Sequence, residues 1–180
     1  MISEDPHFVR FRVYGTPKGQ PRPKAFVRRG AVHGPRAAVY DPATADGWKE
    51  AVRNAALDAI ACPTSSPHAP FYAGKPIVLS VEYIFPRPKN HFRTGKREGQ
   101  VKDSAPHWHT SKPDRNNVEK ALEDALGEWP RGESPVFWDD DRCVVDGRSV
   151  KRYAKEGERA GAVVIPNLQL RGPNILDDAE

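Results

Sequence analysis

The sequence predicts an α+β fold in which two helices pack on one face of a mixed β-sheet. Two observations support this prediction. Helical and strand-like hydrophobic patterns alternate along the 180 residues, and the last two strand patterns follow one another with no helix between them. By its length the chain is one domain, which we place at residues 1–166, followed by a C-terminal tail at 167–180.

The first expected strand covers residues 8–14, where Val9, Phe11 and Val13 alternate with arginines and face inward. Residues 15–24, with the sequence GTPKGQPRPK, follow as a basic loop that is interrupted by prolines. We expect this loop to lack a regular hydrogen-bonded ladder, because proline donates no backbone hydrogen bond.

The first expected helix covers residues 48–61, which carry an apolar stripe at helical spacing. The stripe consists of Trp48, Val52, Ala55, Ala56 and Ala59. Residues 76–86, PIVLSVEYIFP, then form the strongest strand pattern of the chain. Because both faces of this strand contain apolar side chains, we expect it at the centre of the sheet, with Glu82 in a structural ion pair.

The second expected helix lies within residues 111–129, SKPDRNNVEKALEDALGEW. Asn116 and Glu119 form a capping-box pattern at its start, and Gly127 is placed to end it. Its apolar stripe consists of Val118, Ala121, Leu122, Ala125 and Leu126. Its polar face carries Asn117, Lys120 and Asp124.

Acidic residues flank this helix on both sides. Asp114 lies just before the first turn, and three aspartates follow at 139–141 after a short connection. Valines and aromatic residues surround the triplet and suggest a strand, so that either the middle aspartate or the outer two face Asp114. Oxygen ligands without histidine or cysteine suit Mg²⁺ or Mn²⁺, and Lys120 fits phosphate chemistry beside such an ion. A solvated acidic turn is the alternative interpretation of the triplet.

These residues resemble the RusA-type Holliday junction resolvases, a family of small magnesium-dependent endodeoxyribonucleases common in phages and prophages. The family pattern has a KPD-x-D-N start, a lysine three residues after the asparagine, a D-A-L helix end, and a later W-x-D-D followed by a lysine-bearing strand. This chain reads KPDRNNVEKALEDAL and then FWDDDRCVVDGRSVKR. GTPKGQPRPK is similar to the family's basic N-terminal segment, so the resemblance covers roughly residues 8–165.

The resemblance implies a RusA-like fold and three catalytic residues, Asp114, Lys120 and Asp141. It also implies that the two aspartates hold Mg²⁺, or Mn²⁺, with help from Asn116 and Asp140. One position departs from the family pattern, because the second aspartate of the D-x-D pair is Asn116 here. An asparagine carbonyl can ligate a hard cation but adds no negative charge, so we expect weaker metal binding unless Asp139 or Asp140 moves in.

The formal net charge of +4 is mildly basic and allows a polyanionic partner. The positive charge gathers at residues 18–36, which contain no acid, and again at residues 87–102. We expect both segments to contact DNA phosphates. The predicted DNA-binding residues are Lys18, Arg22, Lys24, Arg28, Arg93, Lys96 and Arg97.

Residues 87–111 show no clear hydrophobic period, which is typical of a functional or disordered loop. We expect this loop to close over DNA and to become ordered on binding, with His91, Phe92 and Trp108 available to stack on unpaired bases. The H-x-H sequence at 107–109 lacks a third soft ligand for a transition metal.

The last two strands are expected at residues 144–153 and 162–165, joined through a charged turn as a hairpin. No apolar run approaches the ~20 residues of a membrane helix, and the N-terminus has no signal-peptide pattern. We therefore expect the protein in the cytoplasm of a bacterial host cell. Cys62 and Cys143 have no metal-type spacing and are expected to be reduced thiols.

The sequence thus predicts a magnesium-dependent endodeoxyribonuclease that cleaves phosphodiester bonds at four-way DNA junctions during recombination and repair. The resemblance implies a homodimer, because resolving a junction takes two opposed nicks and a two-fold axis supplies them. Two alternatives are left open. One is a non-catalytic branched-DNA-binding protein of the same fold, and the other is a basic RNA-binding domain whose acidic cluster is a solvated turn.

Overall fold

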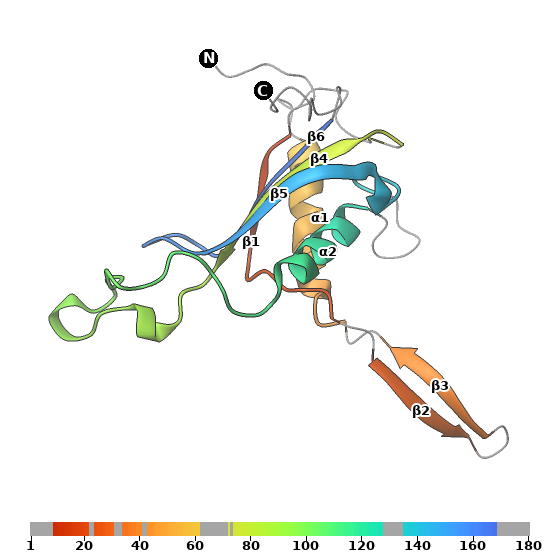
Figure 1. The fold of residues 1–180 in the computed structure, drawn as a ribbon. Helices are drawn as coiled ribbons and strands as arrows, with labels where there is room; N and C mark the ends of the chain where they lie inside the picture. Colours follow the sequence, from red (N-terminus) through yellow and green to blue (C-terminus); the bar gives the residue numbers. More distant parts are fainter. Residues whose placement is uncertain are drawn as a thin grey trace, which may run out of the picture.

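The predicted α+β fold with a mixed sheet is confirmed (Figure 1). The computed structural model describes residues 9–21, 24–30, 34–40, 43–61, 72, 74–127 and 135–168. Its main sheet has four strands in the order β1-β6-β4-β5. These strands are β1 (Phe11–Tyr14), β4 (Ile77–Phe85), β5 (Val144–Tyr153) and β6 (Gly161–Leu168). As predicted, β4 is central, because β5 pairs with it in parallel on one side and β6 antiparallel on the other.

The predicted hairpin between the last two strands is wrong. β5 and β6 run antiparallel to one another, but β4 lies between them and pairs with both. Seven residues, 154–160, connect them. This is long enough to cross the ~10 Å width of one intervening strand, which a tight hairpin turn does not do.

Two helices lie against the same face of the sheet (Figure 1). Their apolar side chains are buried in one core together with those of the strands. The helices are α1 (Asp46–Ala61) and α2 (Arg115–Leu126), and both occur where the hydrophobic period predicted them. The whole predicted stripe of α2 is buried, as are Trp48, Val52 and Ala56 of α1. Neither helix combines the length and the apolar character needed to cross a membrane, as judged over the described part of the chain.

A separate two-stranded sheet follows the basic loop and was not predicted. β2 (Lys24–Gly30) pairs antiparallel with β3 (Gly34–Tyr40), from Lys24 opposite Tyr40 to Gly30 opposite Gly34. A hairpin of two strands has no central strand, so it tolerates the proline and the many charges that hide its pattern. The predicted DNA-binding residues Lys24 and Arg28 lie on β2.

Several predictions fall outside the described residues. They concern Arg22, Cys62 with the loop to residue 70, and the tail beyond residue 168. β6 ends at Leu168, and the proposed boundary between domain and tail stays a prediction. Cys143 is a buried, free thiol, as expected.

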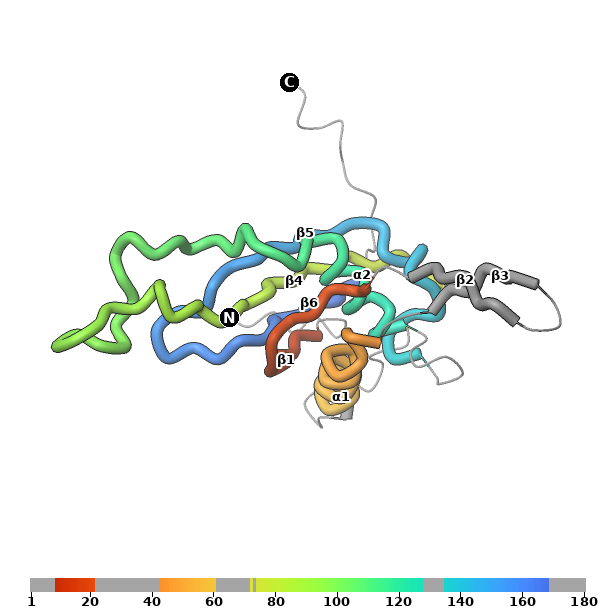
Figure 2. Tube along the Cα trace, turned by 90° about the horizontal axis from the view of Figure 1, so that it is seen from below, coloured from red at the N-terminus to blue at the C-terminus, as the bar shows by residue number. Residues whose placement is uncertain are grey.

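Residues 87–111 project from the end of the main sheet, beside the turn between β5 and β6 (Figures 1 and 2). They contain two short 3-10 helices, η1 (Lys89–His91) and η2 (Gly95–Arg97), and an isolated bridge between Phe92 and Val101. The returning leg joins the edge of β5, where Tyr153 N donates to His107 O over 2.9 Å. The segment is therefore tied to itself and to the sheet by backbone hydrogen bonds.

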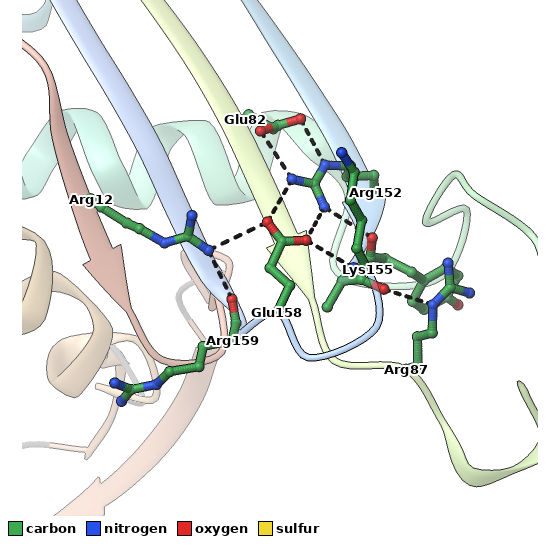
Figure 3. Close-up of polar contacts among 9 residues, drawn as sticks. Arg12, Glu82, Arg87, Arg152, Lys155, Glu158 and Arg159 are labelled. Atoms are coloured by element: carbon green, nitrogen blue, oxygen red, sulfur yellow. Dashed lines mark hydrogen bonds and ion pairs between the residues drawn. The ribbon is translucent and has the colours of Figure 1, made fainter. Parts of the chain in front are cut away.

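A buried guanidinium joins the strands at this end of the sheet (Figure 3). Arg152 of β5 donates from Nε to Glu82 Oε1 over 2.7 Å and from Nη2 to Glu158 Oε1 over 2.9 Å. Arg12 of β1 reaches the same Glu158 oxygen at 3.4 Å. The structural ion pair predicted for Glu82 is confirmed, and the cluster connects β1, β4, β5 and the turn before β6.

The first prediction concerns the contribution of Glu158 to stability. The hydrogen bond from Arg152 lowers the pKa of Glu158 from its ordinary 4.5 to about 2. Its stabilising charge is therefore fully present above the unfolded pKa and is lost as the pH falls toward the folded pKa. At neutral pH we expect Glu158→Gln to lower the free energy of unfolding by about 2 kcal/mol.

Urea unfolding of both proteins between pH ~7 and pH ~2.5 measures this difference. The gap between wild type and variant should narrow as the pH falls. Glu156→Gln, at an exposed position of the same turn, is the matched control. A gap that stays constant over this range would contradict the proposed role of the Glu158 charge.

Candidate active site

The second helix begins two residues earlier than the capping-box pattern predicted. Asp114 is the N-cap, with extended backbone, and the helix runs from Arg115. Asn116 therefore lies inside the first turn, and its Oδ1 accepts from Arg115 Nη2 at 3.3 Å. Aspartate is among the residues that an N-cap favours, which suits Asp114 to this position. The Asp114 carboxylate makes no capping hydrogen bond and is exposed.

Lys151 of β5 holds the segment that leads to Asp114. Its Nζ donates to Ser111 O over 2.9 Å and also to Pro113 O. It lies 5.7 Å from the centre of the Phe85 ring. Burial lowers the pKa of the Lys151 ammonium, while the nearby Asp114 carboxylate opposes that shift. The sequence shows Lys151 only as a lysine on a strand and does not indicate this role, since both accepting groups are backbone carbonyls.

The basic loop before β2 packs against the first turn of α2. Gln20 N donates to Asn117 O over 2.7 Å. A Cβ on Gly19 would lie 2.9 Å from Pro113 Cβ, which is closer than such atoms approach, so this contact requires glycine. Lys18, a predicted DNA-binding residue, is exposed next to this contact.

The acidic triplet does not lie on a strand, and this prediction is wrong. The chain bends at Asp139 and Asp140 and then enters a 3-10 helix, η3 (Asp141–Cys143), before β5 begins. The backbone bends there because Asp140 Oδ1 accepts from Arg142 N over 3.0 Å and so caps η3. Strand alternation therefore does not decide which aspartate faces the helix.

Each aspartate of the triplet has a different partner. Asp141 Oδ2 accepts a hydrogen bond from Lys120 Nζ of α2. Asp140 lies 3.7 Å from Arg142 Nη1, and Asp139 Oδ1 lies 3.6 Å from Cys143 Sγ. Lys120 and Asp141 are thus brought together by the fold.

The contact between Lys120 and Asp141 is a pair of fully charged groups. Partial burial favours the neutral form of Lys120, but hydrogen bonds to Asp141 and Asp124 outweigh it and raise the pKa of Lys120 well above its ordinary range. The hydrogen bond from Lys120 lowers the pKa of Asp141. Lys120 is therefore a cation at neutral pH and not a proton acceptor.

The acidic groups around Lys120 border a hollow of about 250 Å³. Its lining consists of Glu123, Asp124, Gly127, Trp138, Asp139, Asp140 and Asp141. Burial, and then the charge of Glu119, raise the pKa of Glu123.

Asp114 and Asn116 lie near the start of α2, away from this hollow. The six residues from Asp114 to Lys120 alone span about 9 Å along the helix axis. Among the residues that the structure describes, no three His, Cys, Asp or Glu side chains form a group that could hold a metal ion.

The projecting segment gathers its predicted DNA-binding residues around one open hollow of about 680 Å³. The lining consists of Arg93, Thr94, Lys96, Arg97, Lys102, Asp103 and Ser104. Trp108 is 56% exposed, as base stacking requires. His109 stacks on Phe85 with a centroid distance of 3.9 Å, and this contact explains why its ring is half-buried.

The contact between Lys120 and Asp141 joins the two motifs that resemble the resolvases. The family model described as Endodeoxyribonuclease RusA matches residues 15–164. This chain belongs to the RusA endodeoxyribonuclease family. It is also 30% identical over 150 residues to the uncharacterized protein YqaN of Bacillus subtilis (strain 168), and the match covers 82% of this chain and 89% of that protein. No solved structure is significantly similar.

Membership in the RusA family confirms the predicted resemblance and places the chain among DNA-binding endonucleases. The match includes the basic loop, both motifs and the contact between them. The catalytic and metal-binding assignments to Asp114, Asn116, Lys120, Asp140 and Asp141 stay predictions, and so does the DNA contact of the basic residues.

The second prediction tests Lys151. Replacing it by methionine keeps the packing on Phe85 but removes two charge-assisted hydrogen bonds to the segment before α2. We expect the free energy of unfolding to fall by about 1–2 kcal/mol and amide exchange of residues 111–116 to become faster.

Hydrogen-exchange mass spectrometry and urea unfolding measure the two effects. Lys155→Met, which alters an exposed lysine in the following turn, is the control. A loss of stability without faster exchange at 111–116 would mean that Lys151 supports the sheet and not the segment that carries Asp114.

Proposed function

We propose that this RusA-family protein is a magnesium-dependent endonuclease that cleaves four-way DNA junctions during recombination and repair. The observation that carries the proposal is the contact between Lys120 and Asp141, which unites the helix motif with the acidic motif inside the segment matched by the family. A charged lysine held by two carboxylates, with an exposed aspartate at the N-cap of the same helix, suits phosphodiester hydrolysis.

The candidate metal ligands are Asp114, Asn116, Asp140 and Asp141. Their side chains offer only oxygen donors, which hard cations such as Mg²⁺ and Mn²⁺ prefer. Asp114 fits this role because its carboxylate is exposed and caps no helical N–H group. A divalent ion held there would polarise the scissile phosphate and lower the pKa of an attacking water.

Lys120 would act as a fixed positive charge. Because hydrogen bonds to two carboxylates raise its pKa, Lys120 stays protonated at neutral pH. An ammonium placed beside the scissile phosphate stabilises the negative charge that develops on the phosphate oxygens. Asp141 orients this ammonium by accepting a hydrogen bond from it.

The basic residues would hold the DNA backbone. Lys18 lies beside the first turn of α2, and Arg93, Lys96 and Arg97 surround the hollow in the projecting segment. Phosphate contacts of this kind position DNA without reading its sequence, and Trp108 is exposed enough to stack on an unpaired base. The segment would close over branched DNA. We further propose a homodimer, a phage or prophage origin, and action in the bacterial cytoplasm.

Asn116 favours a second candidate function. The family pattern has an aspartate at this position, and its loss removes one negative charge from the candidate ligands. A protein with too little charge to hold the ion would bind branched DNA without cutting it. The two functions differ in chemistry but not in DNA affinity.

The third prediction is the direct test of the enzyme. A labelled synthetic four-way junction and a linear duplex of the same sequence are incubated with the protein, with and without Mg²⁺. We expect paired nicks in the junction that require Mg²⁺, and a loss of about 100-fold or more in Asp114→Asn with unchanged junction binding. Asp58→Asn, an exposed carboxylate of α1, is the control.

Junction binding without cleavage by wild type would instead support the binding protein. Equal rates for Asp114→Asn and wild type would remove Asp114 from the mechanism. Cleavage that is equally fast in the linear duplex would contradict selectivity for branched DNA.

The fourth prediction tests whether the negative charge missing at Asn116 limits metal binding. Asn116→Asp restores a carboxylate in the first turn of α2, so we expect half-maximal activity at about tenfold lower Mg²⁺ concentration. A magnesium titration of the nicking rate measures this. If neither the rate nor its magnesium dependence changes, Asn116 does not lie among the metal ligands.

A further inference from the structure

Lys49 of α1 is a buried cation that pairs with the helix of the candidate active site. It is 4% exposed, and among the charged side chains that the structure describes only Arg152 is similarly buried. Its Nζ lies 3.0 Å from Asp124 Oδ2 of α2. A buried ion pair is often no more stabilising than apolar residues of the same volume, because the loss of hydration offsets the attraction. Because stability alone does not explain such a pair, we consider which groups it contacts.

Asp124 divides its two oxygens between two lysines. Oδ2 accepts from Lys49, and Oδ1 lies 3.0 Å from Lys120 Nζ, four residues earlier on the same helix. Lys120 then donates to Asp141. Positive and negative groups alternate along this chain of contacts, which runs from the core under α1 to the exposed edge of the candidate active site.

The side chains along these contacts become more exposed from Lys49 to Lys120, so the buried end is the fixed one. Lys49 is held by the packing of α1, Asp124 is 25% exposed, and Lys120 is 48% exposed. A lysine that is half exposed on a long side chain loses much rotamer freedom when it is held in one place. The Lys120 side chain is restricted by contacts to two carboxylates, Asp124 on α2 and Asp141 on η3. The contact with Lys49 in turn restricts the rotation of the Asp124 carboxylate.

We propose that Lys49 and Asp124 are positioning residues of the active site: Lys49 fixes the Asp124 carboxylate, and Asp124 holds the Lys120 ammonium beside Asp141. The inference rests on the proposed function, since Lys120 acts in catalysis only if the chain cleaves DNA. It adds two residues outside the candidate catalytic set, one of them on α1.

A purely structural pair between α1 and α2 makes a different prediction. Losing it would lower stability but would leave the Lys120 ammonium and the cleavage step as they are in wild type. A positioning pair changes the surroundings of Lys120 even where the protein remains folded. The test therefore needs a readout at Lys120 itself.

The fifth prediction uses NMR of protein labelled with ¹⁵N at the lysine side chains. An ordered, hydrogen-bonded ammonium exchanges its protons slowly enough to give a proton–nitrogen correlation, and the Lys120 signal is identified by its absence in Lys120→Arg. We expect this signal to disappear or shift in Asp124→Asn and in Lys49→Met. Lys49→Arg, which keeps the charge and the donor, should retain it, and so should the control Asp58→Asn.

Single-turnover cleavage of the junction provides the second readout. We expect the rate to fall about tenfold to 100-fold in Lys49→Met and Asp124→Asn, with junction affinity within about twofold of wild type. Lys49→Arg should recover most of the rate. Removing Asp124 leaves Lys49 buried without this partner and can unfold the protein, so Lys49→Met, which removes the buried charge itself, decides the question in that case.

The two possible failures are distinguishable. If wild type does not cut DNA, the proposed function fails, while the Lys120 signal still shows whether Lys49 and Asp124 hold this ammonium. If wild type cuts DNA, and folded Lys49→Met shows an unchanged Lys120 signal and a wild-type rate, the positioning role is overturned. A lower rate with an unchanged Lys120 signal also overturns it.

Discussion

Burial of one face of α2 determines where the polar groups of the candidate site lie. Five apolar side chains of this helix are buried in the core. Residues three and four positions apart share a helical face, so burying this stripe turns Lys120 outward and leaves Asp114 at the open end. The same packing brings α1 against α2 and places Lys49 beside Asp124. The hydrophobic core thus sets the distances within the site.

Elements with a regular hydrophobic period could be predicted from the sequence. Both helices and the central strand β4 occur where the pattern put them, because their side chains face the core at fixed intervals. Glu82 was assigned to an ion pair correctly, since a carboxylate on a central strand needs a partner. The start of α2 was wrong by two residues. Asn116 and Glu119 match a capping box, but the acid after Pro113 occupies the N-cap first.

The remaining features depend on partners that are distant in the sequence. Lys49 and Asp124 are 75 residues apart, and Lys151 and Pro113 are 38 apart, so no local spacing relates them. The pairing of the last strands failed for the same reason, because a local pattern does not reveal a third strand between them. The bend at the acidic triplet has a local cause, the cap that Asp140 provides for η3, but the neighbouring valines and aromatic residues hide it.

The charges of the site explain why Lys120 has two carboxylates. Lys120 forms ion pairs with Asp141 and with Asp124. Lys49 balances the charge of Asp124 from the core side. If Asp141 turns toward a cation, Lys120 keeps Asp124 and does not become an isolated charge. Asp124 on the helix is thus a counter-ion that need not move, while Asp141, on a short turn at the surface, is the candidate metal ligand. In the positioning role proposed for it, the buried Lys49 holds the Asp124 carboxylate from the core side, and the pair thereby links the packing of α1 to the geometry around Lys120.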